Sequence, residues 1–156
     1  MAVSGDRVSL AESGDIPVIH KIFRQSILTL GRRCYDTRQV EAWAYRSNEA
    51  QFRRWVEEAR TFIYYAGETP VGFGGIEASG HIASLYVAPE VSGKGVAAAL
   101  LTFLLAHPYG MRPQLTTAAS ACSRPLFERF GFQVVRLEEV VRNGVRLHRF
   151  QMVRKQ

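Results

Sequence analysis

The chain has 156 residues, 47% of them hydrophobic and 22% charged, and it carries a formal net charge of +6 at pH 7. This length and this apolar content predict one domain, residues 1–156, with a sizeable core. The positive charge favours anionic partners, but the basic residues are spread along the chain without a basic run or interleaved aromatics, which argues against a nucleic-acid binder.

A strand and a long helix are predicted near the N-terminus. The first residues, MAVSGDRVSLAES, contain no apolar segment of the kind found in secretory signals, so a cytoplasmic location is expected. Within them, RVSLA is typical of a strand. Residues 13–30 follow with apolar side chains at helical spacing after an SGD start, which indicates a helix.

Two short helices are predicted next from their capping residues. Asp36 or Thr37 can cap a helix that runs through Trp43, and Ser47 or Asn48 can cap another. Side-chain oxygens of these types accept a hydrogen bond from a free backbone N–H group at the start of a helix.

Three strands and a helix occupy the middle of the chain. Strands are predicted over residues 61–66, 71–77 and 82–88, and the turn GETP joins the first two. Residues 96–106 are an almost unbroken apolar stretch, which predicts a helix ended by HPYG. This is the longest apolar run and it is too short to span a bilayer, so no membrane partner is expected.

The last third of the chain combines strands with one helix. The predicted elements are a strand over residues 114–119, a helix over 123–130 stopped by Gly131, and strands over 132–141 and 145–153. Asn143 and Gly144 are a strong signal for a type I′ hairpin turn. Because hairpins and crossover helices both occur, we expect an α/β fold (mixed α+β) whose mixed sheet has helices on both faces.

The glycines in YVAPEVSGKGVAAALL raise the question of function. No GxxxxGK followed by serine or threonine occurs, so the segment is not a P-loop. Gly93, Gly95 and Ala98 match the dinucleotide fingerprint, but residues 91–127 contain no acidic residue to bind a ribose. The dinucleotide interpretation therefore fails.

A pyrophosphate site fits the same segment better. Glycines allow the backbone to approach an anion closely, and the first N–H groups of the following helix have no partner within that helix. Lys94, Arg112 and Arg124 add positive charge in a stretch without carboxylates. The alternative is a plain strand-to-helix turn with a solvated lysine.

Two motifs resemble the GNAT superfamily of acyl-CoA-dependent N-acetyltransferases. LYVAP followed closely by SGKGVA is similar to the loop Gln/Arg-x-x-Gly-x-Gly/Ala of that family, with Ser92 in place of the usual arginine or glutamine. SACSRPLFERFGF is similar to its Asn-x-x-Ala-x-x-Phe-Tyr-x-x-x-Gly-Phe segment. The resemblance covers about residues 7–155. It implies a single domain of this family, with a mostly antiparallel twisted sheet of six to seven strands.

The resemblance also implies where acetyl-CoA binds. In this family, pantetheine inserts between two diverging strands, which here are those around residues 85–87 and 116–117. The residues expected to contact the cofactor are Leu85, Tyr86, Val87, Ser92, Gly93, Lys94, Gly95, Val96, Ala97, Ala98, Ser120, Ser123 and Phe127.

The implied activity is transfer of an acetyl group from acetyl-CoA to a primary amine of a small molecule. The amine attacks the thioester directly in a ternary complex, without an acyl-enzyme. A peptide or protein amine is an alternative acceptor. A CoA-binding sensor without catalysis is another alternative, motivated by Ser92 and by Phe127, which stands where many members have a tyrosine that protonates the leaving thiolate.

Three groups are candidates for catalysis. His81 begins its strand at a position where some family members carry a catalytic carboxylate, and an ordinary histidine pKa of about 6.5 suits proton removal near neutrality. Glu77 is a second candidate for the base, and a chain of water molecules is a third. Either side chain could equally be a solvated strand end. The backbone N–H group of Val87 is expected to stabilise the oxyanion.

The acceptor is expected among the first helices and the strand edges, with Ser26, Tyr35 and Trp43 as lining residues. Cys34 and Cys122 have neither the spacing of metal ligands nor that of a disulfide framework, so no metal is expected. A small packing residue is the favoured interpretation of Cys122, ahead of a covalent nucleophile. Members of this family are often dimers, so the resemblance leaves a homodimer open, and the sequence itself is silent on the oligomeric state.

Overall fold

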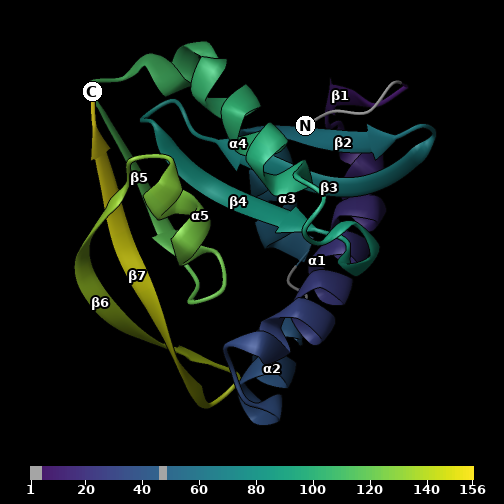
Figure 1. The fold of residues 1–156 in the computed structure, drawn as a ribbon. Coiled ribbons are helices and arrows are strands. Elements are labelled where there is room, and N and C mark those ends of the chain that lie inside the picture. Colours follow the sequence, from purple (N-terminus) through teal and green to yellow (C-terminus); the bar gives the residue numbers. More distant parts are fainter. Residues whose placement is uncertain (1–4, 46–48) are drawn as a thin grey trace.

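The computed structural model describes residues 5–45 and 49–156, which form a seven-stranded sheet with helices on both faces (Figure 1). The strands are β1 (Arg7–Leu10), β2 (Arg60–Ala66), β3 (Thr69–Ile76), β4 (His81–Val87), β5 (Gln114–Ala119), β6 (Gln133–Arg142) and β7 (Val145–Lys155). Their order across the sheet is β1-β2-β3-β4-β5-β7-β6, and β4–β5 is the parallel pair among antiparallel neighbours. The predicted mixed, mostly antiparallel sheet is therefore confirmed.

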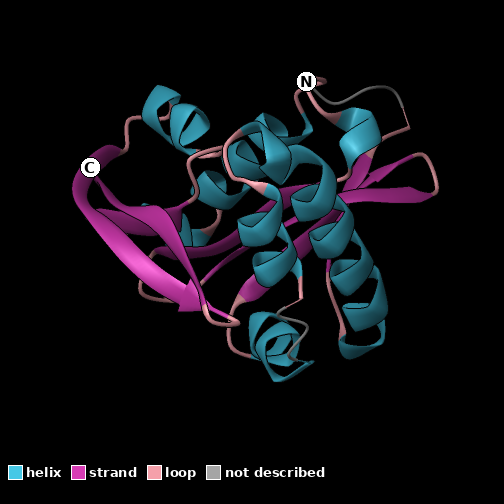
Figure 2. Ribbon diagram, turned by 90° about the horizontal axis from the view of Figure 1, so that it is seen from below, coloured by secondary structure: helices cyan, strands magenta, loops and turns pink. Residues whose placement is uncertain are grey.

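Helices cover the two faces of this sheet (Figures 1 and 2). The α-helices are α1 (Ile16–Leu30), α2 (Thr37–Ala44), α3 (Glu49–Glu57), α4 (Val96–Ala106) and α5 (Arg124–Arg129). Short 3-10 turns lie at Ser13–Asp15, Gly31–Arg33, Pro89–Val91 and Pro108–Met111. The apolar sides of α1, α2 and α3 form one core with the sheet, and α4 and α5 form the core on the opposite face. Among the described residues, no helix is long and apolar enough to cross a membrane.

The start of α2 follows the capping chemistry expected from the sequence. The Asp36 side chain accepts a hydrogen bond from the Gln39 backbone N–H group at 2.8 Å, and the Asp36 N–H group donates to the Gln39 side chain at 3.1 Å. The first helix differs slightly from its prediction, because Ser13–Asp15 forms a 3-10 turn before the proline in the first turn of α1. The predicted cap at Ser47 or Asn48 lies outside the described residues.

Strands β4 and β5 separate soon after they meet. Their parallel pairing is limited to His81 with Thr116 and Ile82 with Thr117. Beyond these residues, β4 stays paired with β3, and β5 stays paired with β7. The edge of β4 that follows Ile82 is therefore left without a strand partner.

A bulge in β4 adds to this separation. Gly75 pairs with Ser84 and Ile76 pairs with Ile82, so Ala83 is an extra residue in β4. A bulge bends its strand and increases the local twist. It therefore helps to turn the rest of β4 away from β5.

The C-terminal hairpin has the turn that its sequence predicts. Asn143 and Gly144 have φ values of 48° and 75°, and Arg142 pairs with Val145 across them. Positive φ at both central residues is the requirement of a type I′ turn. The turn joins β6 to β7, which extends two residues beyond its predicted end at position 153.

Candidate active site

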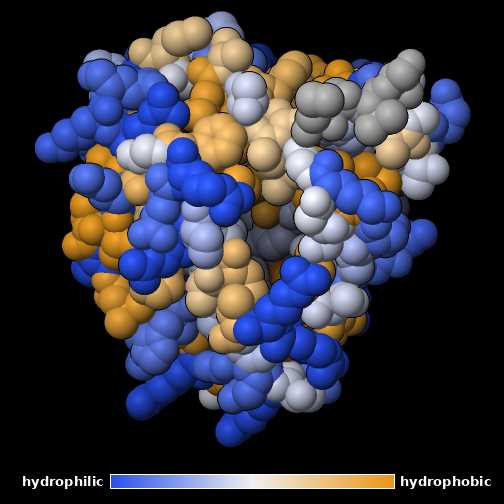
Figure 3. Space-filling view, viewed as in Figure 1, coloured by the Kyte–Doolittle hydropathy of each residue, from blue (hydrophilic) through white to orange (hydrophobic). Residues whose placement is uncertain are grey.

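A cavity of about 670 Å³ runs through the gap between β4 and β5. Its walls come from the loop before α4, the unpaired edge of β4, strand β5 and the start of α5, and on the other side from α1, α2 and β7. Figure 3 shows a hollow near the centre of the face that carries α4 and α5, with hydrophilic and apolar side chains around it. The cavity thus connects the predicted cofactor loop with the predicted acceptor region.

The structure brings nearly all the predicted site residues to this cavity. Those that line it are Ser26, Tyr35, Trp43, His81, Leu85, Tyr86, Val87, Ser92, Gly93, Gly95, Val96, Ala97, Ala98, Ser120, Ser123 and Phe127. Lys94 and Glu77 are not among the described lining residues. The individual roles of these residues stay predictions.

The loop before α4 has the backbone shape that an anion site requires. Gly93 and Gly95 have φ values of 77° and 83°, a region that favours glycine. A side-chain atom added to Gly93 would meet nothing within 4 Å, so space is open at this glycine. The bond from Ala99 N to Gly95 O lies in the first turn of α4, and the N–H groups of residues 96–98 precede it. These residues fit the pyrophosphate of acetyl-CoA.

Arg33 reaches the same loop from the other side of the cavity. Its Nη1 donates a hydrogen bond to Ser92 Oγ at 3.3 Å. Ser92 occupies the position where the family pattern usually has arginine or glutamine, so Arg33 supplies a nearby guanidinium from a different element. No pattern in the sequence predicts this contact, because the two residues are 59 positions apart.

The unpaired edge of β4 presents backbone N–H groups to the gap between β4 and β5. The Ala88 N–H group donates to Val71 O at 2.8 Å, across the pairing with β3. Hydrogen-bonding directions alternate along an antiparallel pair, so the N–H groups of Leu85 and Val87 point away from β3. They face the opening, where a pantetheine chain or a thioester oxygen can accept their hydrogen bonds.

His81 is held at the point where β4 and β5 separate. Its Nδ1 atom lies 2.8 Å from Thr116 Oγ1. Burial lowers the pKa of His81, the Glu77 carboxylate raises it and the Arg149 guanidinium lowers it, with a net shift below 6.5. A lowered pKa keeps the imidazole neutral at neutral pH, the form that accepts a proton. Glu77 itself is bound to the same residue through its N–H group, which donates to His81 O at 2.8 Å.

Cys122 lines the cavity next to Cys34. Burial and a hydrogen bond with the Cys34 side chain raise the pKa of Cys122 to about 12. The thiol therefore stays protonated at neutral pH, whereas a nucleophilic cysteine requires the thiolate. This supports the interpretation of Cys122 as a packing residue.

Tyr35 joins three parts of the site through its hydroxyl group. The hydroxyl donates to His148 O at 2.7 Å and accepts from Ala121 N at 2.9 Å. Burial is the main cause of a raised pKa at Tyr35, which keeps the hydroxyl protonated. Its ring meets that of Trp43 edge-to-face, with centroids 5.6 Å apart. Tyr35 therefore lines the cavity with its ring, while its hydroxyl is committed to holding the walls together.

Phe127 lies in the wall on the α5 side. It is 2% exposed and packs edge-to-face on Phe132, with ring centroids 5.2 Å apart. Its ring supports the cavity wall and has no proton to give to a leaving thiolate.

Sequence reasoning missed several polar residues at the acceptor end. Gln51 from α3, Ser84 from the bulge of β4, and Arg142 and Arg149 from the C-terminal hairpin all line the cavity. None belongs to a recognisable motif, and only the packing of distant elements brings them together.

Comparison with known proteins agrees with this geometry. Residues 32–154 match the family described as the acetyltransferase (GNAT) domain. An uncharacterized N-acetyltransferase of Escherichia coli (strain K12), YafP, is 31% identical over 142 residues, which are 90% of each chain.

Solved structures show the same fold. A GCN5-related N-acetyltransferase from Rhodopseudomonas palustris superposes with a TM-score of 0.89 at 30% identity, covering 100% of this chain and 99% of its own. The PaiA N-acetyltransferase from Thermoplasma acidophilum, solved in complex with coenzyme A, superposes with a TM-score of 0.70 at 15% identity, covering 97% and 99%. With its diverging strands, its glycine loop and these relatives, the chain belongs to the GNAT family and is an N-acetyltransferase that uses acetyl-CoA.

Proposed function

We propose that the protein acetylates a primary amine of a small molecule, by direct attack of the amine on acetyl-CoA within a ternary complex. The observation that carries this proposal is the closure of the acceptor end of the cavity. Tyr35 donates to His148 O at 2.7 Å, and Gln39 Nε2 donates to Arg146 O at 3.0 Å. These two bonds join the α1–α2 segment to the C-terminal hairpin.

This bridge favours a small acceptor over a peptide or protein. A polypeptide chain would need an open groove between the α1–α2 segment and the hairpin, and it would have to break both hydrogen bonds. Both bonds are exposed, so water replaces the lost partners and each broken bond costs about 0.5–1.5 kcal/mol. A small amine can enter the cavity without that cost.

Different residues bind acetyl-CoA, stabilise the oxyanion and remove the proton of the amine. The loop at Gly93 and Gly95 holds the pyrophosphate, and the free edge of β4 orients the pantetheine. Bound acetyl-CoA supplies an activated acetyl thioester. The N–H group of Val87 stabilises negative charge on the thioester oxygen. His81 removes the proton of the amine through Nε2, provided that its Nδ1–H group donates to Thr116 Oγ1.

The surroundings of Ser92 remove one motive for the alternative of a CoA-binding sensor, and the turnover test below decides between the two. The departure of Ser92 from the family pattern motivated that alternative. Arg33 now supplies a positively charged donor beside it, at 3.3 Å. The cofactor end of the site therefore has the donors that an active enzyme uses.

The test is a turnover screen with acetyl-CoA over a broad panel of amines, reading the release of free thiol. The panel includes small amines and peptides with free N-termini or lysines, and a reaction without amine measures background hydrolysis. We expect turnover above background with small amines. Turnover with peptides alone would overturn the small-molecule acceptor, and slow hydrolysis with no amine accepted would favour the sensor.

A further inference from the structure

The formally charged side chains that line the cavity are all positive among the described residues. The arginines and histidines among its described lining are Arg33, Arg129, Arg142, Arg149, His81 and His148, and the described residues contribute no lysine, aspartate or glutamate to it. An acceptor with a second ammonium group would lie among like charges without a carboxylate to neutralise it. Such a juxtaposition is unfavourable in a partly desolvated site.

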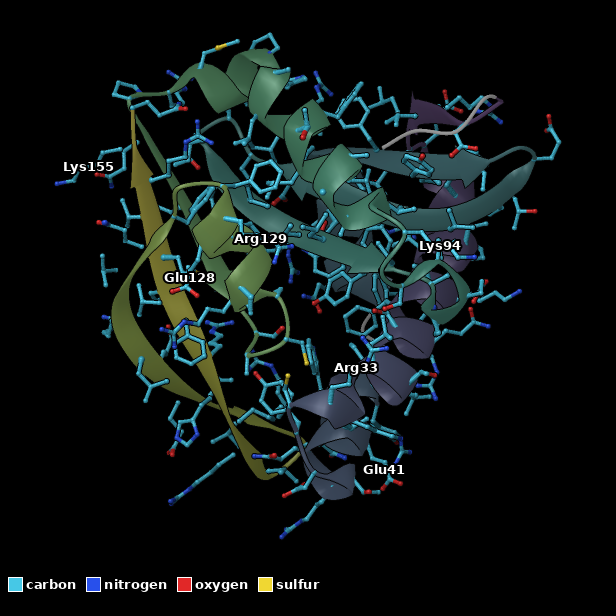
Figure 4. All side chains as sticks on the ribbon, viewed as in Figure 1. Arg33, Glu41, Lys94, Glu128, Arg129 and Lys155 are labelled. Carbon is cyan, nitrogen blue, oxygen red and sulfur yellow. The ribbon has the colours of Figure 1, made fainter. Side chains whose placement is uncertain are left out.

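Two of these arginines lie at the cofactor end. Arg33 is bonded to Ser92 of the glycine loop. Arg129 extends from α5, and Lys94 extends from the loop on the opposite side of this end (Figure 4). The phosphates of acetyl-CoA account for the positive charge here.

The other two arginines lie on the C-terminal hairpin, at the acceptor end. Arg142 ends β6 and Arg149 belongs to β7, close to the bond between Tyr35 and the backbone of His148. Acetyl-CoA carries its negative charge on its phosphates, at the end opposite to the acetyl group. The positive charge of Arg149 is therefore not accounted for by the phosphates of acetyl-CoA.

Arg149 has donor capacity that the protein does not use. Its Nη2 donates to Glu138 Oε1 at 2.8 Å and its Nε is buried without a partner, so Nη1 is the nitrogen left for a ligand. A guanidinium has five N–H donors, and two of them can bind one carboxylate side by side. Its side chain is 33% exposed, and the residue is part of the cavity wall.

Glu138 orients Arg149 but does not neutralise the positive charge of the arginines that line the cavity. The same carboxylate accepts from Gln151 Nε2 and lies 3.5 Å from Arg136 Nη2. One negative charge is therefore shared between two guanidinium groups. Glu138 does not line the cavity, so the surplus positive charge is presented there by Arg149.

We propose that the acceptor amine also carries a carboxylate, which binds to Arg149 at the hairpin end of the cavity. This inference rests on the proposed function and narrows its substrate class to amino-acid-like molecules. The amine nitrogen then lies toward His81 and the thioester, on the β4 side. Gln51 and Ser84 are further polar residues of this wall.

The test compares matched acceptors that differ in charge. Each amino acid is assayed beside its carboxamide and its decarboxylated amine, and diamines and polyamines complete the panel. We expect kcat/KM for the best carboxylate to exceed that of its two matched analogues by at least about tenfold, because the analogues leave the arginine without its partner. Neutral or polycationic amines as the best acceptors would overturn this inference and leave the proposed function intact.

Variants of Arg149 connect this preference to the residue. Arg149→Gln should remove most of the preference for the carboxylate, by about 10- to 100-fold and mainly through KM, while Arg149→Lys should retain part of it. Arg146→Gln is the matched control. It lies on the same strand and its Nε is 3.7 Å from Glu139, but its side chain is 77% exposed and outside this cavity.

Two readouts separate the remaining outcomes. Stabilisation by acetyl-CoA should be equal in wild type, Arg149→Gln and Arg146→Gln, which shows that the fold and the cofactor end are intact. A carboxylate preference that survives in Arg149→Gln would overturn the assignment to Arg149. Failure of every amine with acetyl-CoA bound would overturn the proposed function and this inference together.

Discussion

The proposed base, His81, lies at the point where β4 and β5 separate. His81 is neutral at neutral pH because burial lowers its pKa, and its orientation depends on one hydrogen bond of 2.8 Å to Thr116. A neutral histidine has one protonated and one free nitrogen. The partner of Nδ1 therefore decides whether Nε2 can act as the base.

We expect His81→Ala to lower the rate by about 10²- to 10⁴-fold and to flatten the acidic limb of the pH–rate profile, which in wild type lies below pH 6.5. Thr116→Val should lower kcat, because it removes the bond that orients the ring, whereas Thr116→Ser should restore it. Steady-state kinetics across pH measure these effects. An unchanged profile in His81→Ala would transfer the role to Glu77 or to water.

Gly93 is the residue on which the cofactor loop depends most directly. Acetyl-CoA at about a hundred times its dissociation constant should stabilise wild type by about 2.7 kcal/mol. Gly93→Val should abolish this stabilisation, because a side chain would enter the space open to the phosphates. Lys94→Ala should retain most of it, since backbone N–H groups form most of the anion site.

Gly67→Val is the matched control for Gly93→Val, because it causes the same backbone strain away from the cofactor loop. Gly67 has a φ of 62° in the β2–β3 turn, and an added side-chain atom there also meets nothing within 4 Å. Both variants place a branched residue at positive φ and should lose similar stability without cofactor. Thermal melts with and without acetyl-CoA measure the difference. Normal stabilisation of Gly93→Val would show that the pyrophosphate binds elsewhere.

The element that sets the size of the acceptor site is the β6–β7 hairpin. Its turn is determined locally by Asn143 and Gly144, but its position over the cavity depends on contacts with the α1–α2 segment. The pairing of β7 with β5 anchors the base of the hairpin, and these contacts hold its far end against the α1–α2 segment.

Tyr35→Phe should loosen that wall. The change removes both bonds of the hydroxyl, one exposed and one part-buried, and should lower the free energy of unfolding by about 0.5–1.5 kcal/mol for each. It should also raise the activity on bulky amines relative to small ones. Tyr65→Phe, in β2 and outside the cavity lining, is the control that also loses a phenol hydroxyl. Equal size preference in Tyr35→Phe and wild type would contradict the role of the hairpin as a wall.

For the whole molecule, burial of histidines links stability to pH. Burial is the main cause of lowered pKa values at His20, His81 and His107, relative to 6.5 in the unfolded chain. As the pH falls through 6.5, the unfolded chain binds protons that the folded protein resists. Stability is therefore fully present above this pH and is lost as the pH falls.

Urea unfolding between about pH 8 and pH 5.5 should show a free energy of unfolding that is nearly constant above pH 7.5 and decreases below pH 6.5. His81→Gln should reduce the slope of the decrease. Carboxylates titrate mostly below this window and should contribute little within it. A free energy that rises from pH 6.5 to pH 5.5 would contradict the effect of histidine burial.

The local elements could be predicted because the signals for them are local. The capping box of Asp36 with Gln39 spans one helical turn, the Asn143-Gly144 turn spans two residues, and the apolar stretch at 96–106 forms one helix. The glycine loop before α4 is also predicted by a local signal. Positive φ values and free helix N–H groups follow from adjacent residues, so the cofactor end of the site is readable from the sequence.

The sequence by itself therefore determined the family, the cofactor and the order of the elements. Only the tertiary structure decided the acceptor end, because its contacts join residues far apart in the chain. Arg33 and Ser92 are 59 positions apart, and Tyr35 and His148 are 113 apart. Neighbouring residues impose no such pairing. It arises when α1–α3 and the β6–β7 hairpin pack around the divergence of β4 and β5, and this packing leaves Arg149 in the wall of a cavity to which the described residues contribute no carboxylate.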